Sequence, residues 1–213
     1  MSNPQSHYFE IEMILEGFKQ KEIEIKMPVW APGSYLVREF SKNVNEVKAK
    51  DESNKSLKTT KKAKNTWVLE NSTKSKKIRI TYEVYAFELS VRTSFLDLTH
   101  GFVSGSGVFM YVSGSQNLPG TLEVAPYKDF KKITTALPKS NISIEKDGSE
   151  TFYFENYDHL VDCPIEIGNQ VVFDFVTSGV KHTVAMYGEA NFDIDKLKKD
   201  MPKVIDAETA VFG

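Results

Sequence analysis

The chain has little of what disulfide-bonded, membrane-spanning or nucleic-acid-binding proteins need. It contains one cysteine, Cys163, so an internal disulfide is impossible. Its 27 basic and 29 acidic residues give a net charge of −2, which favours neither nucleic acid nor an anionic membrane as a partner. No apolar run approaches the roughly 20 residues of a transmembrane helix. We therefore expect no nucleic-acid partner and no membrane span.

The sequence also lacks the common catalytic motifs. No two of its 4 histidines have the i, i+4 spacing by which one helical face holds a metal ion. There is no Gly-x-Ser-x-Gly nucleophile elbow. Cys163 precedes a proline, and no histidine partner is indicated, so we interpret it as a small buried residue. We expect no catalytic residue and no metal site in these 213 residues.

What the sequence has in abundance is alternation of apolar and polar residues, which is typical of β-strands. Residues 8–15 and 22–27 are predicted to pair as a hairpin. Residues 76–86 form the longest alternating run and predict a central antiparallel strand. Further strands are predicted near residues 44–51, 66–69, 109–112, 121–126, 142–145, 151–155, 170–176 and 181–186, with an Asp-Gly turn at residues 146–149 and loops at residues 99–107 and 158–168. The pattern predicts a mainly β fold, with an antiparallel β-sandwich-like domain over residues 1–190.

The pattern changes near residue 191. Apolar residues recur at spacings of three and four, which predicts one face of a helix over residues 191–213. Asp193 is a suitable N-cap for this short C-terminal helical segment. Pro202 conflicts with one straight helix, because it removes a hydrogen bond and clashes with the preceding turn. We expect a kink there, or a second helix that starts at Pro202.

Residues 27–40 are the most distinctive stretch, with two prolines, one glycine and three aromatic residues. Each proline favours extended geometry in the residue before it, and Gly33 can turn the chain. We predict a rigid aromatic corner with Trp30 buried, followed over residues 35–40 by one helical turn or the start of a strand.

Three segments carry a family resemblance. The corner contributes Trp30, Pro32, Gly33, Tyr35 and Arg38; the later segments are residues 91–97, with Arg92 and Asp97, and residues 157–168. Together they resemble the N-terminal domain of the glycyl aminopeptidases, which are zinc metallopeptidases of the thermolysin-like group. The resemblance implies that residues 1–190 are a non-catalytic front domain. Residues 191–213 would then be the truncated start of the catalytic domain.

In this family a His-Glu-x-x-His zinc motif, a further glutamate ligand and usually a PDZ domain lie downstream of the front domain, and this sequence contains none of them. The resemblance implies that the complete protein is a zinc metalloaminopeptidase that releases N-terminal glycine or alanine. The 213 residues alone would be inactive and free of zinc. Their partners would be their own catalytic and PDZ domains and a peptide substrate. We expect the bacterial cell envelope or periplasm if an export signal has been removed, and the cytoplasm otherwise.

Acidic residues between residues 158 and 168 suggest how the domain takes part in substrate binding. An aminopeptidase must recognise a free α-ammonium group, and a partly desolvated carboxylate does so by a charge-assisted hydrogen bond. By analogy with thermolysin-like aminopeptidases, we hypothesise that Glu166 or Asp162 helps to form the amine pocket. A plain surface loop is the alternative. Arg92 either binds a carboxylate or pairs internally with Asp97 or Glu88.

A stand-alone β-sandwich that binds carbohydrate or protein is the alternative function. Its stacking platform would be built from Trp30, Tyr35, Trp67, Phe95, Phe102 and Tyr157. Most of these residues lie in segments that we expect to form core strands or the rigid corner, which weakens this interpretation. The lysine-rich residues 55–64 are expected to be a solvated strand edge rather than a binding patch.

Overall fold

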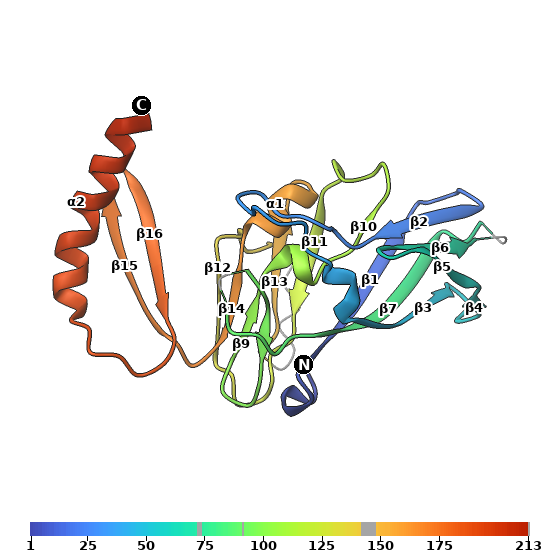
Figure 1. Cartoon of the computed structure of the whole chain (residues 1–213), viewed down its shortest axis with the longest axis horizontal. Coiled ribbons are helices and arrows are strands. Elements are labelled where there is room, and N and C mark those ends of the chain that lie inside the picture. Colours follow the sequence, from blue (N-terminus) through green and yellow to red (C-terminus); the bar gives the residue numbers. More distant parts are fainter. Residues whose placement is uncertain (72–73, 91, 142–147, 213) are drawn as a thin grey trace.

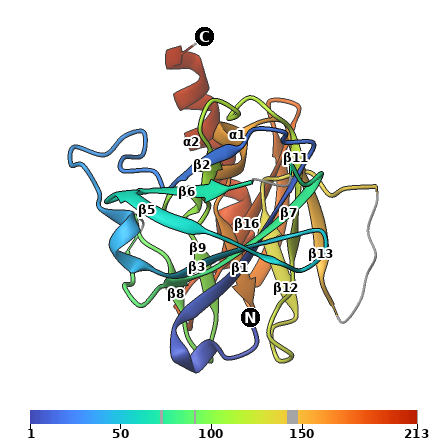
Figure 2. The ribbon, with the colours of Figure 1, turned by 90° about the vertical axis from the view of Figure 1, so that its right-hand side faces the viewer.

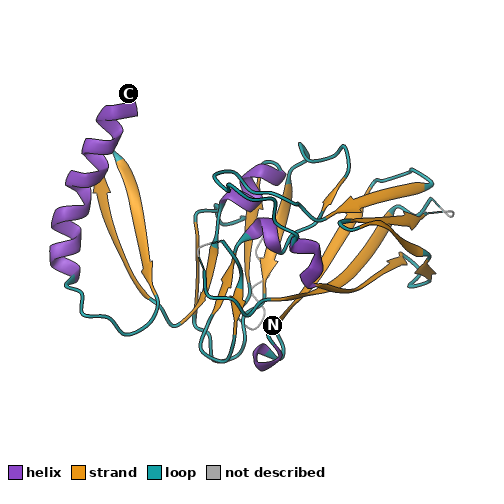
Figure 3. Ribbon diagram, viewed as in Figure 1, coloured by secondary structure: helices purple, strands orange, loops and turns teal. Residues whose placement is uncertain are grey.

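A computed structural model describes residues 1–71, 74–90, 92–141 and 148–212. It is mainly β, with several antiparallel sheets and a C-terminal helix, as predicted (Figures 1 and 3). The strands are β1 (Tyr8–Glu16), β2 (Glu22–Lys26), β3 (Val44–Asp51), β4 (Ser56–Leu57), β5 (Thr59–Ala63), β6 (Thr66–Glu70), β7 (Lys77–Tyr85), β8 (Phe95–Leu96), β9 (Gly101–Val103), β10 (Tyr111–Val112), β11 (Gly120–Val124), β12 (Lys132–Thr135), β13 (Glu150–Phe154), β14 (Ile165–Gly168), β15 (Val171–Thr177) and β16 (Val180–Met186). The α-helices are α1 (Tyr157–Asp162) and α2 (Ile194–Phe212), and short 3-10 turns are η1 (Pro4–Ser6), η2 (Phe40–Asn43) and η3 (Gly105–Gly107).

The first sheet has the order β1-β7-β3-β4, so β7 lies in its interior as predicted. The alternating residues of β7 explain its position. Ile78, Ile80, Tyr82 and Val84 are buried, whereas the residues between them are exposed or half-buried. Burying each of the aliphatic side chains contributes about 1.5–3 kcal/mol.

The predicted hairpin of residues 8–15 and 22–27 is wrong. β1 pairs with β7, and β2 pairs with β6 and β10 in a second sheet of order β10-β2-β6-β5. Both strands do present one apolar face, but the two faces enter a shared core from opposite sheets. Figure 2 shows these two sheets, one behind the other. Alternation alone predicts which face is buried, but it does not say which strand lies alongside.

A third sheet, β12-β14-β9-β8, extends the core toward the C-terminal part (Figure 1). Its strands overturn both predicted loops: residues 99–107 contain β9 and η3, and residues 158–168 contain α1 and β14. Glycine and serine made residues 99–107 look like a loop, and acidic residues around a Cys-Pro break did so for residues 158–168. Gly101, however, is buried against Leu96, and a Cβ there would lie 3.2 Å from Cδ1 of Leu96. The predicted strand at 142–145 and the first half of the turn at 146–149 lie outside the described residues.

The last hairpin, β15 and β16, forms as predicted around Ser178 and Gly179, both of which have positive φ. Phe173 and Phe175 are buried, and α2 packs against β15. Asp193 caps α2 as predicted, since its Oδ1 accepts hydrogen bonds from the backbone amides of Asp195 and Lys196. The helix continues through Pro202, so no second helix begins there.

This C-terminal unit of β15, β16 and α2 stands at one end of the molecule (Figure 1). Within the described ranges, its two strands pair only with each other. Its link to the rest of the chain includes Tyr187, whose ring stacks on His100 at a centroid distance of 3.5 Å. The domain boundary near residue 190 stays a prediction. In the described part of the chain, no helix is long and apolar enough to cross a membrane.

Candidate functional site

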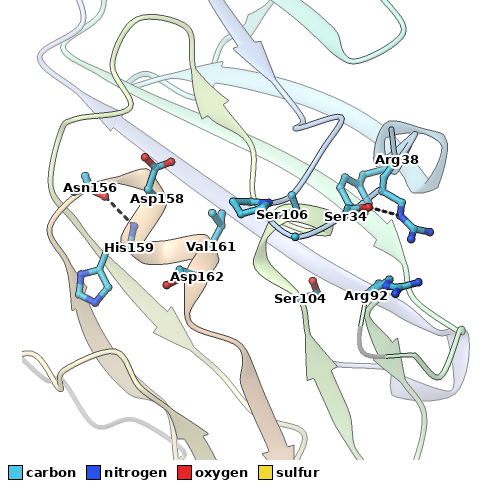
Figure 4. A pocket seen from close by; sticks show the side chains of 14 residues that line it. Ser34, Arg38, Arg92, Ser104, Ser106, Asn156, Asp158, His159, Val161 and Asp162 are labelled. Carbon is cyan, nitrogen blue, oxygen red and sulfur yellow. Dashed lines mark hydrogen bonds between the residues drawn. The ribbon is translucent and has the colours of Figure 1, made fainter. Parts of the chain in front are cut away.

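A cavity of about 730 Å³ brings together the three segments that the sequence singled out (Figure 4). The aromatic corner forms one wall, α1 forms the opposite wall, and the segment around η3 lies between them. The lining residues are Ala31, Pro32, Gly33, Ser34, Arg38, Phe40, Arg92, Ser104, Ser106, Asn156, Asp158, His159, Val161 and Asp162. Segments more than 100 residues apart in sequence therefore build one site.

The aromatic corner is held by its own hydrogen bonds rather than by burial. Trp30 is 48% exposed, so its predicted burial is wrong; its Nε1 donates to the carbonyl of Ser34 at 2.8 Å. The backbone amide of Arg38 donates to the carbonyl of Val29, and Gly33 turns the chain with a φ of +80°. Residues 35–39 form neither a helical turn nor a strand, and Tyr35 is 99% exposed.

The aromatic corner and the segment before β8 each place one arginine at the same end of the cavity. Nε of Arg38 donates to Oγ of Ser34 at 3.3 Å, and Arg92 lies below it in Figure 4. Neither guanidinium forms a salt bridge with a described residue. Among the described residues, Arg92 therefore does not form the alternative ion pair with Asp97 or Glu88.

Asp97 has other partners. Its Oδ1 accepts hydrogen bonds from the amide and hydroxyl of Thr99 and from the amide of His100. Burial by itself would raise the pKa of Asp97, but these hydrogen bonds hold that pKa below its ordinary value. Asp97 thus fixes the turn between β8 and β9 in the third sheet.

Helix α1 supplies the acidic end of the cavity. Oδ1 of Asn156 accepts a hydrogen bond from the amide of His159 at 2.8 Å and so caps the helix. Asp158 and Asp162 are exposed, and neither makes a salt bridge within the described ranges. Nδ1 of His159 accepts from the amide of Glu155 at 3.3 Å, which orients its ring. Two aspartates that line the cavity therefore have no salt-bridge partner among the described residues.

Buried contacts hold η3 and the segment that follows it in place. A Cβ on Gly105 would lie 2.7 Å from the Cα of Val161, so only glycine lets η3 pack this closely on α1. The buried Tyr82 hydroxyl donates to the carbonyl of Val108 at 3.0 Å and accepts from the amide of Met110 at 3.0 Å. Burial raises the pKa of Tyr82 well above its ordinary value, so the hydroxyl stays protonated as a donor.

The two predicted amine-pocket residues are not brought together. Asp162 lines the cavity, but Glu166 lies on β14, on the sheet face opposite its buried neighbours Ile165 and Ile167. Glu166 stands between Thr134 on β12 and Phe102 on β9. Its Oε1 is buried without a hydrogen-bond partner in the described structure, and burial raises the pKa of Glu166 to about 7. Oε1 of the buried Gln170, four residues later in the chain, is likewise buried without a hydrogen-bond partner in the described structure.

The remaining candidates have structural positions. Cys163 is buried as predicted, and burial, together with the nearby charge of Asp162, raises the pKa of its thiol. Trp67 is buried in β6, and Tyr157 donates its hydroxyl to the carbonyl of Phe109. No group of three or more histidine, cysteine or acidic side chains able to hold a metal ion occurs among the residues whose positions are described.

Sequence reasoning named Arg38 only as part of a motif and Arg92 as a possible carboxylate ligand or ion-pair member, and it missed that the two share a cavity with Asp158 and Asp162. The sequence does carry one signal of this arrangement, because each charged residue stands in a segment that the family resemblance marks. Which of those segments would meet could not be found without the fold.

Comparison with known proteins agrees with these observations. Residues 1–169 match the model of the family described as the peptidase M61 N-terminal domain. Among solved structures, the chain is similar to a crystal structure described as an aminopeptidase N family protein from Idiomarina loihiensis, with 29% sequence identity and a TM-score of 0.88. The similarity covers 99% of this chain but only 35% of that one. No curated protein matches the chain. Because the family model covers most of the sequence, this chain belongs to the peptidase M61 N-terminal domain family.

Proposed function

We propose that this chain is the non-catalytic front domain of a glycyl-aminopeptidase-like zinc metallopeptidase, and that it scaffolds the catalytic domain and helps to shape its substrate site. One observation carries the proposal. The chain is similar over 99% of its length to 35% of a larger aminopeptidase-family chain, which leaves most of that chain without a counterpart here. The downstream catalytic and PDZ domains and the peptide substrate are parts of the same proposal.

The C-terminal unit is proposed to begin the downstream domain. The family match ends at residue 169, just before β15, so this proposal moves the boundary from residue 190 to about residue 170. One face of the β15–β16 sheet is covered by α2, while Val176 on the other face is 67% exposed. A two-stranded sheet is marginally stable by itself, so further strands or helices would be expected to complete this layer.

In this proposal, residues of the downstream domain would hold zinc, which would supply Lewis-acid activation of water when bound. The task of the front domain is then to position the substrate. Glu166 suits recognition of an ammonium group, because one of its carboxylate oxygens is buried without a hydrogen-bond partner in the described structure. Phe102 is the residue opposite Glu166 on the neighbouring strand β9, and an aromatic ring can also attract a cation. Asp162 suits the same role because it lines the cavity. We propose that one of these two carboxylates binds the α-ammonium group.

The test uses the complete protein encoded by the native gene, with glycine p-nitroanilide as the substrate. We expect hydrolysis that is lost on chelation and restored by zinc, and none from the 213 residues alone. Glu166→Gln and Asp162→Asn are compared with Asp129→Asn, a change at an exposed aspartate. The amine-binding residue is the one whose substitution raises KM. No activity in the complete protein would overturn the proposed function, and unchanged KM in both variants would overturn the amine-site assignment alone.

A further inference from the structure

The cavity between the aromatic corner and α1 separates opposite charges along its length. Figure 4 shows Arg38 and Arg92 at one end and Asp158 and Asp162 at the other. In the described structure, none of these four side chains has a salt-bridge partner. A ligand that is anionic at one end and cationic at the other would satisfy both pairs.

The middle of the cavity offers uncharged hydrogen-bonding groups. Ser104 and Ser106 lie between the charged ends, and within the described part of the chain their hydroxyls make no hydrogen bond. A serine hydroxyl both donates and accepts, so it suits the N–H and C=O groups of a peptide backbone. The volume of about 730 Å³ lies within the range of pockets that hold small molecules.

The cavity is also built before any ligand arrives. The corner is closed by the hydrogen bonds of Trp30 and Arg38 to its own backbone. The opposite wall is fixed because Gly105 packs directly on the backbone of α1. Such preorganisation lowers the cost of ordering the site when a ligand binds.

We propose that this cavity binds the zwitterionic form of a short peptide, with its terminal carboxylate at Arg38 and Arg92 and its ammonium group at Asp158 and Asp162. A planar guanidinium can bind a carboxylate through two parallel hydrogen bonds, which suits the arginine end. The aspartates would repel a ligand with two negative ends, and the arginines would repel one with two positive ends. The two charged ends together therefore select a zwitterion.

The site goes beyond the proposed function. That proposal assigns one carboxylate to the amine of a substrate in the complete enzyme, whereas this cavity also holds a receptor for the opposite end of a peptide. It is formed entirely by the chain described here and needs no downstream domain. Binding can therefore be measured without any activity, and an inactive complete protein would leave this inference untouched.

The test is titration of the 213-residue chain with triglycine, followed by amide chemical shifts in NMR spectra. Peptide concentrations up to about 20 mM cover millimolar dissociation constants. We expect saturable shifts in residues 31–38, 104–106 and 156–162. Triglycine amide lacks the carboxylate and N-acetyl-triglycine lacks the ammonium group, and each should bind at least about threefold more weakly, as expected for partly exposed ion pairs.

Matched variants locate the two ends of the ligand. Arg92→Gln should weaken binding of triglycine at least about threefold but leave binding of its amide unchanged, whereas Arg79→Gln on β7 should affect neither. Asp162→Asn should weaken triglycine in the same way, and Asp129→Asn should not. Unchanged spectra of the remaining residues would show that each variant is folded. Absence of saturable shifts in the cavity, or equal binding of all three peptides, would overturn the proposal.

Discussion

The buried carboxyl of Glu166 should make the stability of the chain depend on pH in an unusual direction. Its pKa rises from 4.5 to about 7 on folding, because burial disfavours the charged form. The folded state therefore binds more protons than the unfolded state between these two values. By linkage, the contribution of Glu166 to stability is fully present below about pH 4.5 and is lost as the pH rises to about 7.

The size of the effect follows from the two pKa values. Their difference of about 2.5 corresponds to about 3.4 kcal/mol. The side chain is partly exposed, and solvent screening reduces the expected effect to about 2 kcal/mol. Glu166→Gln removes the ionisation, so the variant should gain about 2 kcal/mol relative to the original chain between about pH 5 and pH 8.

Urea unfolding of both proteins at these two pH values measures the difference. Carboxylates whose pKa is lowered, such as Asp97, contribute equally in both proteins and cancel. Glu123→Gln, at an exposed position on β11, is the control and should show no such gain. If the difference between Glu166→Gln and the original chain were the same at both pH values, Glu166 would be ionised in the folded state at pH 5 and the reasoning would fail.

Two substitutions and one measurement of thiol reactivity test the buried framework of the domain. Tyr82→Phe leaves the buried amide of Met110 without its acceptor, so it should lower the free energy of unfolding by about 1–3 kcal/mol in urea titrations; an unchanged midpoint would contradict the buried hydrogen bonds. Gly105→Ala places a methyl group 2.7 Å from the Cα of Val161, so α1 must shift and the melting temperature should fall by several degrees in calorimetry; full retention would show that the packing is looser. Cys163 should react with a disulfide reagent much more slowly in the folded chain than in denaturant, because its thiol is buried with a raised pKa; equal rates would contradict its burial.

The sequence predicts the β character of the chain well, because alternation reports directly which face of a strand is buried. The interior position of β7 follows from its long alternating run, and the β15–β16 hairpin follows from alternation around Ser178 and Gly179. Pairing in the first 27 residues was predicted incorrectly, since neighbouring strands β1 and β2 contribute to the same core from different sheets. Local pattern cannot distinguish pairing side by side from packing face to face.

For the candidate site, too, the sequence predicts local features but not which segments meet in the fold. The motif segments were identified from the sequence, and the fold brings them to one cavity. The exposure of Trp30 was predicted incorrectly because large aromatic residues are usually buried, whereas this one closes a surface loop by donating to Ser34. Glu166 and Asp162 looked equivalent in sequence, but Asp162 is the last residue of α1 and Glu166 lies in β14, which places them in different surroundings. Such separation depends on tertiary contacts and has no local signal.

The reading frame that follows the codon for Gly213 in the native gene tests the central claim most directly. The account predicts that the frame continues and encodes a His-Glu-x-x-His motif within a downstream catalytic domain. A frame that ends at Gly213, or one that continues without any zinc-binding motif, would contradict the assignment of this chain as the front domain of a zinc aminopeptidase.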